Sequence, residues 1–258
     1  MKKLFGASIS AGLLACSGLA FADSHEGATL EPATPVEIFT CKYVEGKGPD
    51  DLDEVVSAWN DWADGQGLSD YSAWTLIPYY SSPEQDFDVI WLGGAPSATA
   101  LGRSQDAWIA TGGEVNAQFQ AVVDCNNHSA YASLEFKQPP EHENPDNVVV
   151  SFSDCNVSEG SSFNDLVPAM MEWAAYREEH DSTAGMWAMM PAMGGGGEAF
   201  DFKWVTAHQN LADLGADFDQ YSKSGWQKGN ELFADKVSCD ASRVYLATNQ
   251  RRGEDSDG

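Results

Sequence analysis

The chain has 258 residues, and its 14 Lys and Arg against 40 Asp and Glu give a formal net charge of −26. A chain this acidic is repelled by nucleic acid and by anionic lipid, so neither is expected as a partner. An acidic surface can also hold calcium, but the chain contains no Asp-x-Asp-x-Asp-Gly loop.

Residues 1–22 are typical of a secretory signal peptide, with Lys2 and Lys3, an apolar run and small residues before the cleavage point. Cleavage after Ala22 predicts a periplasmic or secreted protein. The stretch "LLAC" gives an alternative, in which Cys16 becomes a lipidated N-terminus, although the apolar residues after it argue against this. No later segment is long and apolar enough to span a membrane.

Two copies of one unit follow each other along the chain. Cys41 and Cys155 are 114 positions apart, and Cys125 and Cys239 show the same spacing. Between them "CKYVEG" matches "CNVSEG" and "FDVIWL" matches "FDFKWV". The mature chain is therefore divided into a disordered leader (23–35), repeat 1 (36–137), a linker (138–147), repeat 2 (148–249) and a disordered tail (250–258).

Each repeat opens with a β-branched and aromatic strand, "VEIFTCKYV" in repeat 1 and "VVVSFSDCNV" in repeat 2. A helix follows, because apolar residues recur there at helical spacing. Asp51 is expected to be its N-cap, with Glu54 completing a capping box, and Asp165 is expected to cap the equivalent helix of repeat 2.

Two further strands come next, "YSAWTLIPYY" and "DFDVIWLGG" in repeat 1. A helical region then spans residues 97–123, broken near Gly112 and Gly113, and its counterpart spans 207–237, broken near Gly225. A last strand, "SAYASLEF" in repeat 1, completes the order β-α-β-β-α-β.

That order resembles the ferredoxin-like unit, and a tandem pair of such units resembles the dimeric α/β-barrel superfamily. The resemblance covers both repeats and rests on element order and duplication, without a signature motif. It implies an α+β fold, a single-chain pseudo-dimeric α/β barrel in which two four-stranded sheets face each other with the helices outside.

Four cysteines remain after signal cleavage, and an even number in an oxidising compartment indicates two disulfides, for which three connectivities exist. In a ferredoxin-like sheet the first and last strands are antiparallel neighbours. The resemblance therefore implies the pairs Cys41–Cys125 and Cys155–Cys239. A structural staple is expected, because no Cys-x-x-Cys motif is present.

Tryptophans occupy matched positions in the two copies: Trp59 and Trp173, Trp74 and Trp187, Trp91 and Trp204. Matched aromatic residues are typical of a duplicated core, but they also fit a cavity between the sheets that binds a small apolar or aromatic molecule. We therefore expect an exported small-molecule-binding protein without a cofactor. The alternatives are a cofactor-independent monooxygenase- or isomerase-like enzyme and a non-enzymatic structural or interaction module.

The enzyme alternative has three candidate bases. Asp88 and Asp201 each follow a Phe inside an aromatic strand, where a buried carboxyl would have a raised pKa, although both could equally face solvent. His208 ends the strand "KWVTAH" and is the histidine expected nearest the barrel mouth. Because some α/β-barrel relatives bind haem, His208 is also the residue considered as a haem ligand.

Four methionines, in "MWAMMPAM", raise the alternative of a copper site, since thioethers suit Cu(I). They match ordinary core positions of repeat 1, and a strand points adjacent residues such as Met189 and Met190 to opposite faces. A core strand is expected, and no metal site is predicted. The four are Met186, Met189, Met190 and Met193, which align in the repeat with Ala73, Leu76, Ile77 and Tyr80.

Overall fold

The structure is a computed structural model that describes residues 30–140 and 145–253. The predicted signal peptide, its cleavage after Ala22 and the alternative of lipidation at Cys16 lie outside the described residues. Within the described ranges, no helix is both long and apolar enough to cross a membrane.

The first half of the chain contains β1 (Thr34–Tyr43), α1 (Pro49–Gly65), β2 (Ser72–Tyr80), β3 (Val89–Gly94), α2 (Ala98–Thr111), α3 (Gly113–Gln120) and β4 (Val123–Lys137). The second half contains β5 (Asn147–Val157), α4 (Phe163–Glu179), β6 (Gly185–Met193), β7 (Phe202–His208), α5 (Leu211–Gln220), the π-helical turn η1 (Tyr221–Gly225), α6 (Trp226–Phe233), β8 (Val237–Cys239) and β9 (Arg243–Arg251). The fold class is therefore mixed α and β.

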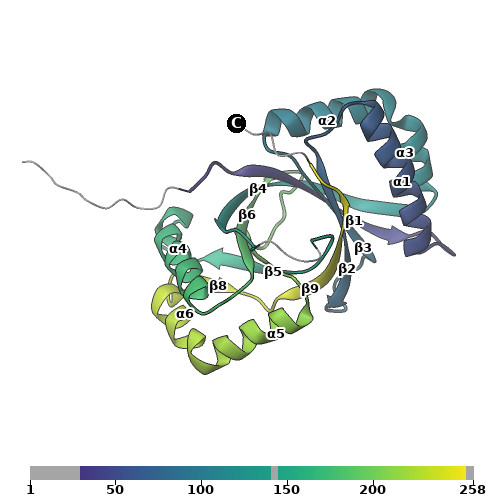
Figure 1. Cartoon of the computed structure of the whole chain (residues 1–258). Helices are drawn as coiled ribbons and strands as arrows, with labels where there is room; N and C mark the ends of the chain where they lie inside the picture. Colours follow the sequence, from purple (N-terminus) through teal and green to yellow (C-terminus); the bar gives the residue numbers. More distant parts are fainter. Residues whose placement is uncertain (1–29, 141–144, 254–258) are drawn as a thin grey trace, which may run out of the picture.

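Eight strands form one closed antiparallel barrel (Figure 1). The strand order is β4-β1-β3-β2 in the first half and β9-β5-β7-β6 in the second, so corresponding strands lie in corresponding places. The edge strands of the two halves pair with each other, β2 with β9 and β4 with β6, and this closes the barrel. Helices α1 to α3 cover one side of the barrel and α4 to α6 cover the opposite side.

Side chains alternate between the inside of the barrel and the helix-covered outside, as the period of two in a strand requires. Along β3, Ile90 and Leu92 belong to the inner cluster, whereas Val89 and Trp91 pack under the helices. Every strand of the closed barrel contributes to the inner cluster, whose buried members are Val36, Ile38, Leu76, Ile90, Tyr131, Phe152, Met189, Val205, Tyr245 and Ala247. The inside of the barrel is thus a packed core.

Helices α1 and α4 begin before the predicted caps. The N-cap of α1 is Gly48, and Asp51 stands three positions later, where its Oδ2 accepts a hydrogen bond from the Gly48 backbone N–H at 3.0 Å. Asp165 accepts in the same way from Ser162 at 2.8 Å. Assigning Asp51 and Asp165 as the caps themselves was wrong, because an aspartate can satisfy a free N–H from the third helical position as well as from the cap.

Strand β9 runs two residues into the stretch predicted as the disordered tail (250–258). Its last residue, Arg251, donates from Nη2 to the Leu68 carbonyl at 2.8 Å and pairs with Asp64 at 2.8 Å. These contacts tie the end of the second half to helix α1 of the first.

Both predicted disulfides are confirmed. Cys41–Cys125 joins β1 to β4, and Cys155–Cys239 joins β5 to β8, each across neighbouring antiparallel strands. The two residues of each pair are 84 positions apart, so each bond closes a loop of the same length.

Candidate functional site

Two cavities lie outside the barrel wall, under the helices. The larger, about 880 Å³, is enclosed by strands β1 to β4 and helices α1 to α3. The smaller, about 330 Å³, lies between the sheet of the second half and helices α4 and α6. Both volumes fall in the range of roughly 300–1,000 Å³ that is usual for small-molecule sites. They do not lie between the two sheets, where a cavity was expected, because the inner cluster occupies that space.

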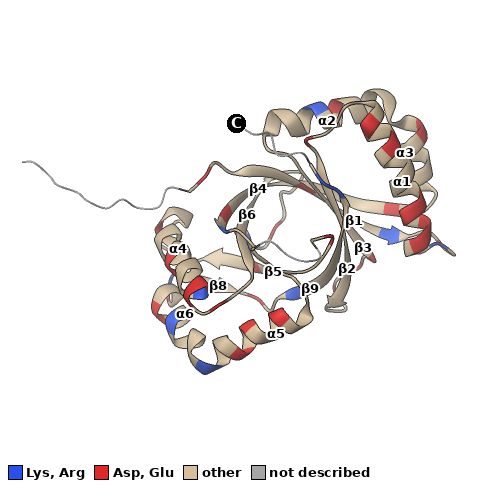
Figure 2. Cartoon of the chain, viewed as in Figure 1, with Lys and Arg blue, Asp and Glu red and all other residues tan. Residues whose placement is uncertain are grey.

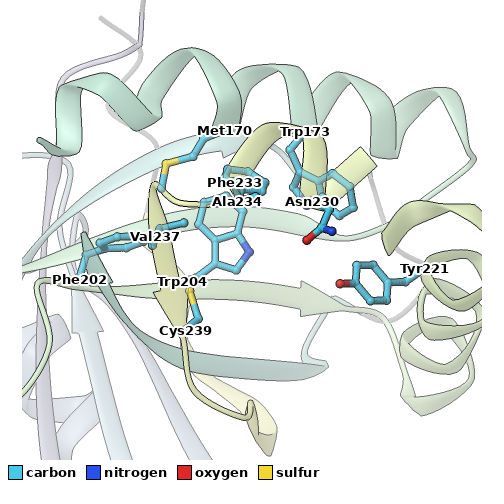
Figure 3. A pocket seen from close by; sticks show the side chains of 11 residues that line it. Met170, Trp173, Phe202, Trp204, Tyr221, Asn230, Phe233, Ala234, Val237 and Cys239 are labelled. Atoms are coloured by element: carbon cyan, nitrogen blue, oxygen red, sulfur yellow. The ribbon is translucent and has the colours of Figure 1, made fainter. Parts of the chain in front are cut away.

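The linings of the two cavities correspond residue by residue. Six pairs of identical residues, each 113 or 114 positions apart, have one member in each lining: Trp59 and Trp173, Trp91 and Trp204, Asn116 and Asn230, Phe119 and Phe233, Val123 and Val237, Cys125 and Cys239. Figure 3 shows the smaller cavity, in which Trp173 on α4 faces Trp204 on the sheet and Asn230 lies near Trp173. The same aromatic pocket is therefore built twice, once under each helical layer.

Aromatic side chains from three helices and the sheet form the wall of the larger cavity. Trp59 on α1 lies edge-to-face against Trp91 on β3, with ring centroids 4.9 Å apart, and Trp62 lies in the same way against Trp108 on α2, at 5.1 Å. Phe119 on α3 contacts Trp91 and Trp108 at 5.9 and 6.2 Å. Because each such pair adds about 0.5–1.5 kcal/mol beyond the burial of its surface, the contacts hold the wall in a fixed geometry.

One buried carboxylate also lines the larger cavity. Glu37 on β1 is 4% exposed. Its Oε1 accepts from the Tyr71 hydroxyl at 2.7 Å, and its Oε2 accepts from Gln105 Nε2 at 2.9 Å and pairs with His128 Nε2 at 2.8 Å. Trp91 Nε1 in turn donates to the Tyr71 hydroxyl at 3.2 Å. A carboxylate has about four acceptor positions, so one remains for a ligand after these three bonds.

The surroundings of Glu37 keep it ionised. Burial acts to raise its pKa, but hydrogen bonds from His128, Tyr71 and Gln105, with the charge of His128, outweigh burial and lower the pKa below its ordinary value. Burial, and then the negative charge of Glu37, raise the pKa of Tyr71 well above its ordinary value. At neutral pH the site therefore holds an anion and a neutral phenol that donates to it.

Gly93 on β3 makes room for this arrangement. A β-carbon there would overlap the Tyr71 hydroxyl and lie 3.1 Å from Glu37 Cγ, whereas one at Gly94 would meet nothing nearer than 3.6 Å. We expect Gly93→Ala to lower the free energy of unfolding by about 1–3 kcal/mol through overpacking, and Gly94→Ala to change it by less than about 0.5 kcal/mol. Urea unfolding followed by circular dichroism measures both. Equal effects of the two substitutions would contradict the close packing of Tyr71 on Gly93.

The lowered pKa of Glu37 predicts that this residue stabilises the fold less in acid. Because the folded pKa lies below the unfolded one, the stabilisation is complete above the unfolded value, about 4.3, and is lost as pH falls through the folded value. Glu37→Gln cannot titrate. The difference in free energy of unfolding between wild type and Glu37→Gln should therefore shrink as the pH falls below the unfolded value of about 4.3, which urea unfolding at a series of acid pH values tests. A difference that stays constant with pH would contradict the ionised state of Glu37.

The second half lacks the charged cluster at the equivalent positions. Ser151 stands where the first half has Glu37, and Ser242 stands where it has His128, each 114 positions later. Ser151 Oγ bonds to Thr206 Oγ1 at 2.7 Å, and Ser242 Oγ bonds to Ser153 Oγ at 2.7 Å. Small hydroxyls thus satisfy one another there, and the two cavities differ in charge as well as in volume.

The six tryptophans singled out in the sequence separate into three pairs: Trp59 and Trp91 line the larger cavity, Trp173 and Trp204 line the smaller, and Trp74 and Trp187 pack against the inner cluster. Four of the six thus reach a cavity. Trp74 and Trp187 lie on the inner faces of β2 and β6, inside the barrel.

Asp88 and Asp201 are exposed residues that immediately precede strands β3 and β7. Asp88 Oδ2 accepts from the Tyr43 backbone N–H at 2.9 Å, and Asp201 Oδ2 accepts from the Val157 backbone N–H at 2.8 Å. Each therefore satisfies the backbone at the end of the first strand of its half, and neither lines either cavity. This matched placement is structural and gives a general base no access to a bound ligand.

His208 is buried, with 2% of its surface exposed, and its Nε2 lies 2.7 Å from Asp217 Oδ2. Asp217 also pairs with Arg177 and accepts from the Ser182 hydroxyl at 2.9 Å. The network ties α5 to the end of α4 and the end of β7. His208 lines neither cavity, so it contacts no candidate ligand site.

The four methionines do not converge. Met186 is buried under the helices of the second half, Met189 belongs to the inner cluster, and Met193 is 65% exposed. The strand therefore points their sulfurs to different faces, which removes the copper alternative. Across residues 30–140 and 145–253, no group of three His, Cys, Asp or Glu side chains could hold a metal ion.

The residues that give the larger cavity its chemistry were not among the sequence candidates. These are Glu37, Tyr71, Gln105 and His128. A signal for Glu37 was present, because a charged residue in "VEIFT" alternates with Val36 and Ile38 and must face away from the inner cluster. Ser242 stands at the position of the second half that corresponds to His128. This difference was a second signal, because it showed that the two halves are chemically different there.

No protein-family model matches the chain, and no curated protein matches its sequence. Solved structures do resemble its fold. A mutant chlorite dismutase from Candidatus Nitrospira defluvii has a TM-score of 0.52 at 10% identity, covering 85% of this chain and 93% of its own. A candidate monooxygenase from Lactobacillus acidophilus has a TM-score of 0.52 at 8% identity, covering 84% and 94%. A dye-decolorizing peroxidase from Bacteroides thetaiotaomicron has a TM-score of 0.50 at 10% identity, covering 85% and 94%.

These likenesses identify the class of fold, that of the dimeric α/β barrels, which the sequence resemblance predicted. Identities of 8 to 10% carry the comparison no further than the fold. One fold of this kind supports many chemistries, so the function must be argued from the cavity itself.

Proposed function

We propose that the protein binds a small, largely apolar aromatic molecule in the larger cavity, under helices α1 to α3. The observation that carries the proposal is a cavity of about 880 Å³ with aromatic walls and one buried, ionised carboxylate in its lining. Mostly apolar pockets with a few placed polar groups are the usual form of small-molecule sites. Trp62, Trp91 and Trp108 are only half-buried, so a ligand in the cavity can cover them.

The proposal also covers the evolutionary origin of the chain and the cellular location of the protein. The two halves are ferredoxin-like repeats of one ancestral unit, supported by their common strand order, the equal separation of their cysteines and the matched cavity linings. The protein is exported, which fits two disulfides. The smaller cavity is the reduced counterpart of the ligand site.

Haem does not fit the residues of either cavity. His208, the residue considered as its ligand, lines neither of them. The histidine that does line the larger cavity, His128, has its Nε2 bonded to Glu37 and its ring stacked on Phe39 at 3.8 Å. Neither lining contains a Lys or Arg to pair with the two propionates of haem. No step of the proposed function therefore depends on haem.

The proposal is tested with N-phenyl-1-naphthylamine, a neutral aromatic probe whose fluorescence rises in apolar surroundings. We expect saturable binding of the probe with quenching of tryptophan emission. Trp108→Ala removes part of the cavity wall and should weaken binding about tenfold, equivalent to the loss of a few apolar contacts. Trp226→Ala is the control, because Trp226 is 46% exposed on α6 and lines neither cavity. Absence of binding, or equal loss in the two variants, would overturn the proposal.

A second candidate function is proton transfer on the bound molecule without a cofactor. It is favoured by the Glu37–His128 pair, in which a buried carboxylate orients an imidazole whose side chain is 49% exposed. His128→Gln tests it, since Gln can still donate to Glu37 but cannot accept and return a proton. Under this candidate His128→Gln keeps the affinity for the probe but abolishes turnover of any converted substrate.

A further inference from the structure

The charged side chains in the lining of the larger cavity all have one sign, apart from His128. The charged side chains in its lining are Glu37 and Asp124, with no Lys or Arg. Glu37 is held ionised by its hydrogen bonds. The rest of the polar lining is neutral, so the cavity presents a negative interior next to its aromatic walls.

Acidic residues on the helices that enclose the cavity make the electrostatic field around it more negative. Figure 2 shows acidic residues along α1 and on α3, and a single basic segment on α2. Arg103 is the one basic residue of the three helices. Their acidic residues are Asp50, Asp51, Asp53, Glu54, Asp61, Asp64, Asp106 and Glu114. Such a field raises the local concentration of cations and speeds their arrival.

The basic side chains nearby are already neutralised. Lys42 pairs with Asp86 at 2.5 Å, Lys47 pairs with Asp51 at 2.6 Å, and Arg103 pairs with Asp70 at 3.3 Å. These three cations compensate acids at the surface and contribute nothing to the lining of the cavity.

Tryptophan faces in this fold already bind cations. Arg251 lies over Trp59, with its guanidinium carbon 5.9 Å from the ring centroid, and Arg177 lies over the equivalent Trp173 at 5.6 Å. Both guanidinium groups come from outside the cavities and leave the half-buried Trp62, Trp91 and Trp108 available. An organic cation held over a tryptophan face gains about 0.5–2 kcal/mol.

From these observations we infer that the ligand of the larger cavity is an ammonium cation that carries an aromatic group. Its charged group lies against the tryptophan faces with Glu37 as counter-ion, and its apolar part fills the remainder of the cavity. The inference rests on the proposed function and specifies the class of ligand.

Three phenols of the same shape and different charge test the inference. They are 4-(trimethylammonio)phenol, its neutral isostere 4-tert-butylphenol, and the anion 4-hydroxybenzenesulfonate. Each competes with N-phenyl-1-naphthylamine for the full-length protein in about 0.15 M salt, which screens charges more than roughly 8 Å away. We expect the cation to bind about tenfold more tightly than the neutral isostere, and the anion to bind most weakly.

Substitutions then locate the preference. Glu37→Gln keeps the shape of the side chain and should lower the cation-to-neutral ratio from about ten to about three, which leaves the contribution of the tryptophan faces, and Asp124→Asn, at an exposed position of the lining, should lower the ratio by about twofold. Glu179→Gln, on α4 of the second half, changes net charge equally and should leave the ratio unchanged.

Two results would overturn the inference: the neutral isostere binding as tightly as the cation, or a ratio that Glu37→Gln and Asp124→Asn leave unchanged. In both cases the proposed function would stand, because the probe still binds. Failure of N-phenyl-1-naphthylamine to bind wild type would instead remove the proposed function and the inference together.

Discussion

Replacing Cys41 and Cys125 by alanine is expected to lower the free energy of unfolding by about 4–5 kcal/mol. The two residues are 84 positions apart, and the loop-entropy relation gives a value of that size for a loop this long. The bond also fixes β1 against β4 at the place where both strands line the larger cavity. Urea unfolding of the double variant, followed by circular dichroism, measures the loss.

The second disulfide supplies the matched control. Cys155→Ala with Cys239→Ala opens a loop of the same length, so loop entropy predicts an equal loss. Cys41 and Cys155 are both buried, at 3% and 0% exposed, which makes the two double substitutions comparable in packing as well. Losses below about 1 kcal/mol in either variant would contradict the role of these bonds as staples between β1 and β4 and between β5 and β8.

The fold could be predicted from the sequence to the level of its topology class. Spacing between cysteines indicated two similar halves, period-two and helical patterns predicted the element order, and the resemblance implied the disulfides that the structure contains. The patterns were weaker at element ends. Asp51 and Asp165 stand at the third position of their helices instead of at the N-cap. Strand β9 extends to Arg251 because the Arg251 side chain pairs with Asp64 on α1, a contact that no local sequence pattern indicates.

The sequence predicted the tryptophans that form the site, but it did not predict where the cavity lies in the fold. Tryptophans were singled out, and four of them line cavities, yet the cavities lie under the helices. Local sequence fixes which face of a strand a residue occupies, but not whether helices or a second sheet cover that face. Glu37, Gln105 and His128 come from three separate elements and Tyr71 from the loop before β2, and only tertiary packing brings them together.

Replacing Glu37 by leucine should lower both the free energy of unfolding and the preference of the larger cavity for cations. Leucine occupies a similar volume but leaves the buried Tyr71 hydroxyl without its carboxylate acceptor and leaves Gln105 and His128 without theirs. Loss of one member of a buried charged network costs about 3–5 kcal/mol, and we expect the lower end because the half-exposed His128 can turn to water. Urea unfolding measures the change in stability.

Ser151→Ala provides the comparison at the same strand position of the second half. Ser151 is 6% exposed and bonded to one hydroxyl, so its removal should cost only about 1 kcal/mol. If the loss from Glu37→Leu arises in the network, Tyr71→Phe should cost far less in the Glu37→Leu background than in wild type, because the phenol has already lost its acceptor. Additive losses would show that Glu37 and Tyr71 act independently. Glu37 would then be a packed residue of the sheet, and the charge of the cavity would have to come from Asp124 and the enclosing helices.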